Sequence, residues 1–157
     1  MTAMVHGSAV AIQGNGLLLL GPSGSGKSDL ALRLIDRGAK LICDDVVNIE
    51  SGNSLPLLAC APNIAGKIEV RGIGICSIDF VHSAPLRLIV QLAQDVDRMP
   101  PEHQRISLAG YSVPMFRLPP FHPSSAIKVE WALRSVIDAG LHPLANADAA
   151  FNESVTM

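Results

Sequence analysis

The sequence has few charged residues and no excess of either sign. Charged residues are 17% of the 157 residues, and the formal net charge at pH 7 is -2. With 48% hydrophobic residues, the chain is unlike the polar, highly charged sequences that stay disordered, so we expect it to fold. Because there is no basic excess, no overall field attracts nucleic acid or an anionic membrane surface. We therefore expect neither of these as a partner.

Cysteine is also scarce. The three cysteines, Cys43, Cys60 and Cys76, are odd in number, lie far apart and include no CxxC pair. This pattern favours neither a disulfide framework nor a zinc site. We expect buried free thiols in a reducing cytoplasm.

Long apolar runs are missing as well. No stretch approaches the roughly 18 apolar residues of a membrane-spanning helix. The first twenty residues lack the basic start, apolar run and small-residue cleavage site of a signal peptide. We therefore expect a cytoplasmic protein. Its length is typical of one domain, which we place at residues 1–142, followed by a flexible tail over 143–157, where no organised pattern follows Pro143.

The hydrophobic pattern predicts an alternation of strands and helices. Apolar runs at 8–12 and 16–20 are separated by Gln13-Gly14-Asn15, and Asn15-Gly16 is a strong turn signal, so they predict a β-hairpin. Helical spacing of apolar residues predicts helices over 28–37 and 124–139. The second of these is expected to bury Ile127, Trp131, Leu133, Val136 and Ile137. We further expect strands over 41–50 and 86–93, an extended piece over 113–118, a short strand and loop over 55–62, and a loop or bulged strand beside a ligand over 68–78.

Residues 21–28 read GPSGSGKS and match the P-loop pattern. They follow four leucines and precede an amphipathic helix, which is the strand–loop–helix context that this motif requires. Glycines let the loop wrap a phosphate with its backbone N–H groups. Lys27 can reach the β- and γ-phosphates, Ser28 can bind magnesium, and the helix directs its positive end at the anion. The sequence therefore predicts nucleotide binding through Gly21, Pro22, Ser23, Gly24, Ser25, Gly26, Lys27 and Ser28.

Asp44 and Asp45 are the leading candidates for acid–base chemistry beside the P-loop. They end the apolar run 41–43, and in a parallel pairing the carboxyl end of that strand lies at the same edge of the sheet as the P-loop. Adjacent strand residues point to opposite faces, so at most one is expected to face the phosphate squarely. One carboxylate would take a hydroxyl proton or hold the metal, while the other orients its partners. A solvated acidic pair is the alternative.

Three blocks of sequence resemble the catalytic domain of the HPr kinase/phosphorylase family. Residues 6–45 read HGSAVAIQGNGLLLLGPSGSGKSDLALRLIDRGAKLICDD, residues 68–75 read IEVRGIGI like the family signature, and Asp97-Arg98 resembles the aspartate–arginine step that follows. Together they cover most of residues 5–140. The resemblance implies an α/β P-loop fold related to phosphoenolpyruvate carboxykinase, with a mixed sheet. It also implies a hexamer, and similarity to short forms that lack the family's N-terminal domain.

The activity that the resemblance implies is ATP-dependent phosphorylation of a serine of HPr, the phosphocarrier of the bacterial sugar phosphotransferase system. Some members also reverse the reaction by phosphorolysis. The matching positions imply that two ligands hold the magnesium, that an aspartate accepts the serine proton beside a histidine, and that an arginine steadies the transferring group. The magnesium ligands would be Ser28 and Glu69, and Lys27 would be the P-loop lysine. The proton acceptor would be Asp45, with Asp44 beside it and His6 as the histidine. The arginine would be Arg98.

Each role has an ordinary alternative. His6 would be a surface histidine, Glu69 would belong to an exposed strand face with Arg71, and Arg98 would lie in a solvated loop.

One stretch departs from the family pattern. Members usually carry proline-glycine-arginine-asparagine before the last helix, linked to dephosphorylation, whereas this chain has His122-Pro123-Ser124-Ser125. The arginine and glycine that would help to hold inorganic phosphate are missing. We therefore expect a kinase with weak or absent phosphorolysis. Two other functions remain open: a small-molecule kinase or ATPase with the same P-loop, and a non-catalytic module that senses ATP.

Overall fold

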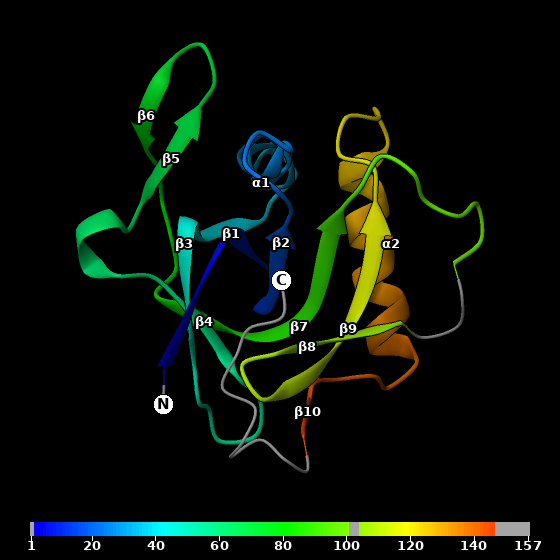
Figure 1. The fold of residues 1–157 in the computed structure, drawn as a ribbon. Coiled ribbons are helices and arrows are strands. Elements are labelled where there is room, and N and C mark those ends of the chain that lie inside the picture. Colours follow the sequence, from blue (N-terminus) through cyan, green and yellow to red (C-terminus); the bar gives the residue numbers. More distant parts are fainter. Residues whose placement is uncertain (1, 101–103, 147–157) are drawn as a thin grey trace.

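The computed structural model describes residues 2–100 and 104–146, which form a mixed sheet with helices on one face and a separate hairpin (Figure 1). Its strands are β1 (Thr2–Ile12), β2 (Asn15–Leu20), β3 (Lys40–Glu50), β4 (Leu57–Ala59), β5 (Lys67–Val70), β6 (Gly74–Ser77), β7 (Ser83–Leu92), β8 (Arg105–Leu108), β9 (Tyr111–Leu118) and β10 (Leu144–Ala145). The helices are α1 (Lys27–Asp36) and α2 (Ser125–Asp138), and a 3-10 turn spans Pro62–Ile64.

The eight-stranded sheet has the order β10-β9-β7-β2-β1-β3-β4, with β8 paired to β9. β1 is antiparallel to both β2 and β3, whereas β2 is parallel to β7 and β7 is parallel to β9. β4 also pairs with the beginning of β7, so β7, β2, β1, β3 and β4 form a closed circuit of pairings. This confirms the expected α/β fold with a mixed sheet.

The first hairpin leads directly into the P-loop. β1 and β2 pair from Ser8↔Leu19 to Ile12↔Asn15, as the two apolar runs predict. The turn, however, lies at Gln13 and Gly14, which have φ values of 50° and 80°. Two positive φ values in a two-residue connection are typical of a type I′ turn, whose twist suits paired strands. Asn15 begins β2 instead of turning, and its side-chain amide donates to the Ile12 carbonyl at 3.3 Å.

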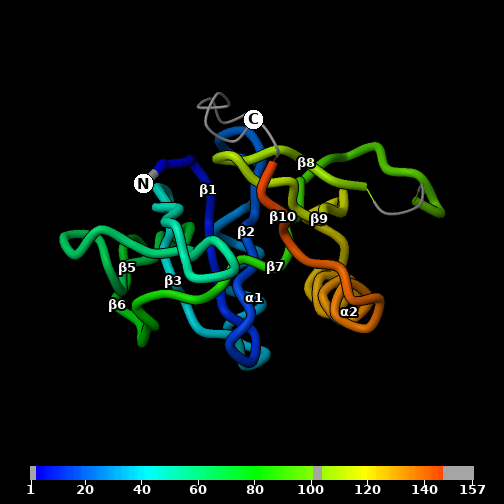
Figure 2. The backbone as a smooth tube through the Cα atoms, turned by 90° about the horizontal axis from the view of Figure 1, so that it is seen from below, coloured from blue at the N-terminus to red at the C-terminus, as the bar shows by residue number. Residues whose placement is uncertain are grey.

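Two apolar clusters lie on opposite faces of the sheet. One joins both helices to the sheet through residues such as Leu30, Leu34, Leu88 and Val129, all fully buried. Figure 2 shows α1 and α2 side by side on this face. The other cluster lines the opposite face. The four leucines at 17–20 divide between the clusters in strict alternation, which fixes the end of β2, and thus the start of the P-loop, firmly in the core.

α2 has the predicted position, but part of its predicted buried face is wrong. Leu133 and Val136 are buried, whereas Trp131 is 60% exposed, and Ile127 and Ile137 are also exposed. The helix instead buries a narrower face, made by Ser125, Ala126, Val129, Ala132, Leu133 and Val136. Trp131 packs under the guanidinium of Arg134, which lies 4.6 Å from the ring centroid.

Several elements differ from the sequence predictions. Residues 67–77 form a regular antiparallel hairpin, β5–β6, in place of the expected loop or bulged strand. β8 and the first part of β1 were not predicted. Leu144 and Ala145, expected in the flexible tail, pair with β9, while residues 147–157 lie outside the described part of the chain. No described helix is long and apolar enough to cross a membrane.

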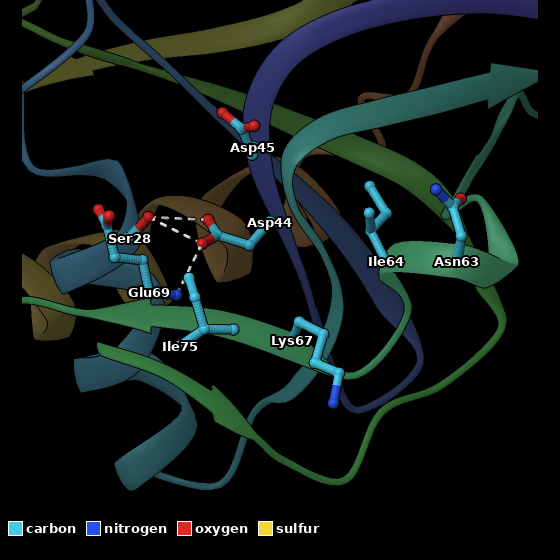
Figure 3. A pocket seen from close by; sticks show the side chains of 8 residues that line it. All are labelled: Ser28, Asp44, Asp45, Asn63, Ile64, Lys67, Glu69 and Ile75. Atoms are coloured by element: carbon cyan, nitrogen blue, oxygen red, sulfur yellow. Dashed lines mark hydrogen bonds between the residues drawn. The ribbon is translucent and has the colours of Figure 1, made fainter. Parts of the chain in front are cut away.

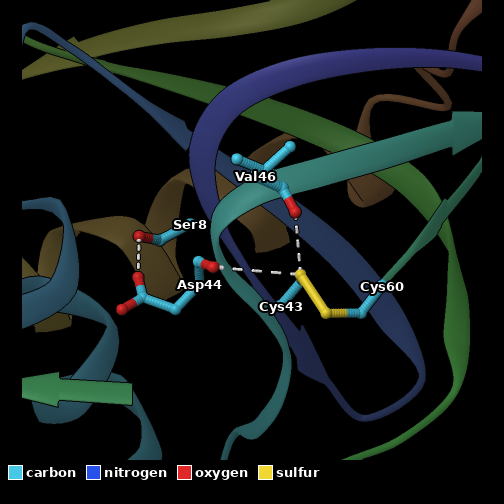
Figure 4. Close-up of a disulfide and its surroundings, with 5 residues drawn as sticks. All are labelled: Ser8, Cys43, Asp44, Val46 and Cys60. Carbon is cyan, nitrogen blue, oxygen red and sulfur yellow. Dashed lines mark hydrogen bonds between the residues drawn. A yellow bond between two sulfur atoms is a disulfide. The ribbon is translucent and has the colours of Figure 1, made fainter. Parts of the chain in front are cut away.

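Cys43 and Cys60 form a disulfide, with their Cα atoms 5.1 Å apart (Figure 4). The expectation of buried free thiols is therefore wrong for this pair; Cys76 is free, as expected, but it is only partly buried. β4 returns antiparallel along β3, and this brings together two cysteines separated by 17 residues in sequence. Cys43 directly precedes Asp44, so the disulfide lies next to the acidic pair.

Candidate functional site

The P-loop connects the buried end of β2 to the first turn of α1. Gly24 and Gly26 have φ values of 79° and 98°, a region that glycine occupies without steric cost. Within the loop the Ser25 amide donates to the Pro22 carbonyl at 3.0 Å. The loop therefore has the backbone conformation that a glycine-rich phosphate cradle needs.

Lys27 lies at the start of α1 and folds back over the loop. Its ammonium group donates to the carbonyls of Gly21 at 2.7 Å and Pro22 at 3.0 Å. Burial lowers the pKa of Lys27, while the nearby carboxylates of Asp44 and Asp45 act in the opposite direction. The positive charge is thus held at the mouth of the loop, between the loop backbone and the acidic pair.

Asp44 joins the P-loop helix and the β5–β6 hairpin (Figure 3) to β1 (Figure 4). Its carboxylate accepts hydrogen bonds from Ser28 Oγ, which lies 2.9 Å from each oxygen, and from Ser8 Oγ at 2.6 Å. The backbone N–H of Glu69 donates to the same carboxylate at 3.3 Å. Asp44 is only 7% exposed, so this carboxylate depends on these donors. Its position is therefore fixed relative to the P-loop serine.

Asp45 occupies a different environment although it is the next residue. It lies in the middle of β3, not at the end of a strand as predicted, and its φ of 81° interrupts the regular strand geometry. This region is unusual for a residue other than glycine, and such residues cluster at functional sites. The side chain is exposed, and it lines the same two cavities as Asp44. The distortion thus lets both carboxylates border the site.

Two adjoining cavities lie between the P-loop and the β5–β6 hairpin. The smaller, of about 360 Å³, is lined by Ser28, both aspartates, Glu69 and residues of the hairpin and the 3-10 turn. The larger, of about 660 Å³, adds the P-loop, Ser8, Arg71 and Phe121. Glu69 borders both, as expected of a residue that takes part in the site. The hairpin thus forms one wall of the space in front of the P-loop.

His6 and Arg98 are less closely connected to this site. His6 is exposed on β1, opposite Val46 and two residues before Ser8 on the same face. Arg98 lies on an exposed segment between β7 and β8, and neither cavity includes it. The structure brings together the P-loop, the acidic pair and Glu69, and leaves Arg98 apart from them.

Ser8 is the site residue that sequence reasoning missed. It is 1% exposed and donates the shortest hydrogen bond that Asp44 receives. Ser8 faces Asp44 across the β1–β3 pairing, whose register shifts between Ala9 and Val10. A polar residue within the otherwise apolar run 8–12 was the available signal.

The residues present fit a nucleoside triphosphate with magnesium. The buried hydroxyl of Ser25 in the loop has no hydrogen-bond partner among the described residues, and Lys27 supplies a cation. Within residues 2–100 and 104–146 no group of three His, Cys, Asp or Glu side chains is placed to hold a metal alone. Magnesium is commonly held by one or two protein ligands together with substrate phosphates and water. Ser28, Asp44 and Glu69 suit such a shared site.

This fold and site define a P-loop α/β domain with an acidic pair opposite its phosphate loop. The family model for the HPr serine kinase C-terminal domain matches residues 1–137. The chain belongs to this family.

Similar proteins agree with this assignment. HPr kinase/phosphorylase of Treponema pallidum (strain Nichols) is 33% identical over an alignment of 132 positions, which covers 75% of this chain and 41% of the relative. The protein of the same name from Burkholderia lata is 38% identical over an alignment of 125 positions, which covers 74% of this chain and 38% of the relative. The solved structure of the Hpr(Ser) kinase/phosphatase from Coxiella burnetii superposes with a TM-score of 0.77 at 26% identity, covering 88% of this chain and 98% of that one. The matched region spans about two fifths of the length of these curated relatives.

Proposed function

We propose that this domain is an ATP-dependent protein-serine kinase whose substrate is the phosphocarrier protein HPr, and that it works in the cytoplasm as one folded domain. The observation that carries the proposal is the arrangement of Ser28, Asp44 and Asp45, which sets two carboxylates across a cavity from a P-loop. Membership of the HPr serine kinase family and the names of the relatives support the protein substrate.

The P-loop would hold the β- and γ-phosphates of ATP with its backbone amides. Lys27 would exchange its contacts with the Gly21 and Pro22 carbonyls for phosphate oxygens. The N-terminus of α1 adds a favourable potential for the anion. These groups position the γ-phosphate at the cavity that the two aspartates border.

Magnesium would sit beside Ser28, with Asp44 and Glu69 close to it. When bound, the ion neutralises the charge of the phosphate oxygens. Asp44 holds Ser28 in place through its hydrogen bonds, and the hairpin brings Glu69 to the cavity. We assign the two expected ligands, Ser28 and Glu69, to this position, with Asp44 fixing them.

Asp45 is the residue that we assign as proton acceptor. In the reaction, the substrate serine oxygen forms a bond to the γ-phosphorus, the bond from that phosphorus to the bridging oxygen of ADP breaks, and the serine proton passes to a carboxylate. Asp44 has its oxygens engaged by Ser8, Ser28 and the Glu69 amide. Asp45 is exposed in the cavity, so it is the carboxylate that an incoming serine can reach.

The remaining residues complete the proposal. His6 would support Asp45 from the adjacent strand, since its neighbour Gly7 pairs with Asp45. Arg98 would act on the transferring group only after its segment approaches the cavity. We expect weak or absent phosphorolysis because the 122–125 stretch lacks an arginine. A homo-hexamer is expected from the family resemblance.

The test is the intact mass of HPr after incubation with this chain, ATP and magnesium. We expect the mass of one phosphate to be added at a serine, and Asp45→Asn to abolish this transfer while ATP still binds. Asp138→Asn, at the exposed end of α2, is the matched control and should leave transfer unchanged. An unmodified HPr would refute the proposed substrate, and full activity of Asp45→Asn would refute the proposed proton acceptor.

A further inference from the structure

Phe121 is a large apolar side chain that the fold leaves uncovered beside the P-loop. It is 59% exposed and lines the larger cavity together with Gly24, Gly26 and Lys27. Exposing an aromatic ring to water at the edge of a polar cavity gives up the free energy of burying it. Within residues 2–100 and 104–146, this ring keeps most of its surface open to the cavity.

The backbone on both sides of Phe121 is held rigidly. Arg33 of α1, paired with Asp29 at 3.1 Å, donates to the carbonyls of Pro120 and His122. From the other side, Ser125 Oγ donates to the Pro119 carbonyl at 2.6 Å and accepts from the His122 amide at 3.1 Å. The exposed ring is thus carried by a loop tied to both helices.

The ring also packs directly on the phosphate loop. A methyl group placed on Gly26 would lie only 2.8 Å from Cε1 and 2.9 Å from Cζ of Phe121, so the edge of the ring touches the glycine that begins α1. The ring is therefore fixed relative to the site where the phosphates would bind. Its remaining exposed surface borders the cavity.

We propose that Phe121 is the stacking platform for the nucleobase. The proposal rests on the proposed function, because it assumes that the P-loop holds the phosphates of a nucleotide. The larger cavity, of about 660 Å³, is lined by the P-loop, by Asp29 and Leu32 of α1 and by Phe121, and this volume leaves room for a sugar and a base beside the phosphates. Stacking uses the flat face that every base has, without reading its hydrogen-bonding edge. Phe121 therefore strengthens binding of ATP and GTP alike.

The test compares the affinities of ATP and inorganic tripolyphosphate, each with magnesium, for the whole chain by titration calorimetry. Phe121→Ala is expected to weaken ATP binding by roughly tenfold or more, since base stacking on an aromatic side chain is lost, and to leave tripolyphosphate binding unchanged. Phe121→Trp keeps a flat face and should retain ATP affinity. Phe121→Leu keeps an apolar side chain over Gly26 but no flat face, and should lose it.

Several results would overturn this assignment. One is equal weakening of both ligands by Phe121→Ala, which would mean that the ring only supports the loop. Others are unchanged ATP binding in Phe121→Ala and full affinity in Phe121→Leu. Lys27→Ala serves as the reference, because it should weaken both ligands together. Failure of HPr phosphorylation with normal ATP binding would refute the proposed substrate and leave the stacking result intact, so the two failures are distinguishable.

Discussion

Replacing Ser8 with alanine should destabilise the protein through Asp44. The hydroxyl of Ser8 donates to Oδ1 of Asp44 at 2.6 Å, and both residues are buried, so water does not readily replace the lost donor. A hydrogen bond to a charged group contributes about 1.5–3 kcal/mol. Asp44 keeps its donors from Ser28 and the Glu69 amide, so the loss should stay below the ~3–5 kcal/mol cost of leaving a buried charge without its partner.

The assay is equilibrium unfolding in urea. With a slope of about 2 kcal/mol per molar urea, a loss of about 2 kcal/mol lowers the unfolding midpoint of Ser8→Ala by about 1 M. Ser54→Ala is the matched control, because Ser54 is exposed in a bend, and its change should stay within about 0.5 kcal/mol. A double-mutant cycle with Asp44→Ala isolates the pair. A Ser8→Ala protein as stable as the control, or a coupling energy near zero, would refute the reasoning.

Three further predictions follow from other features. Burial lowers the pKa of Lys27, so the free protein loses this charge as the pH rises through a value below the ordinary ~10.4. ATP affinity, measured by calorimetry, should therefore fall in that alkaline range, and Lys27→Arg should move this loss of affinity to higher pH. A constant ATP affinity across the range would contradict this. Iodoacetamide should alkylate one cysteine in the unfolded, unreduced chain and three after reduction, counted from the intact mass. Reducing Cys43–Cys60 should cost about 3 kcal/mol in urea unfolding; three alkylations without reductant would contradict the bond. Leu133→Ala should lose about 2–5 kcal/mol and Trp131→Ala about 1 kcal/mol or less, because only the first is buried; equal losses would mean that the two faces of α2 are wrongly assigned.

The sequence predicted those features of the site that depend on neighbouring residues. The P-loop is one continuous stretch between a strand and a helix, so its residues are close in space whatever the rest of the chain does. The β1–β2 hairpin and the helix after the P-loop follow from local patterns in the same way. The position of Asp44 and Asp45 after an apolar run predicted a role for them, and the family resemblance added Glu69. The structure places all three carboxylates around shared cavities.

The features that sequence could not predict depend on register and on the choice between two faces. The contact between Ser8 and Asp44 requires a particular alignment of β1 on β3, including an irregularity that no local pattern encodes. α2 carries apolar residues on more than one face, and the face with Val129 is buried where the sheet lies close, while Trp131 points outward. The disulfide likewise depends on how β4 returns to β3.

The closed circuit of strand pairings has a consequence for motion at the phosphate loop. β2 is paired on both sides, by β1 and by β7, and its leucines are almost completely buried. Its amide hydrogens should therefore be among the slowest in the protein to exchange with deuterated water. Protection should drop sharply at Gly21, where the chain leaves the sheet. Any movement of the phosphate loop itself would then be confined to the few residues between Gly21 and Gly26, because the strand that holds them is paired along both edges.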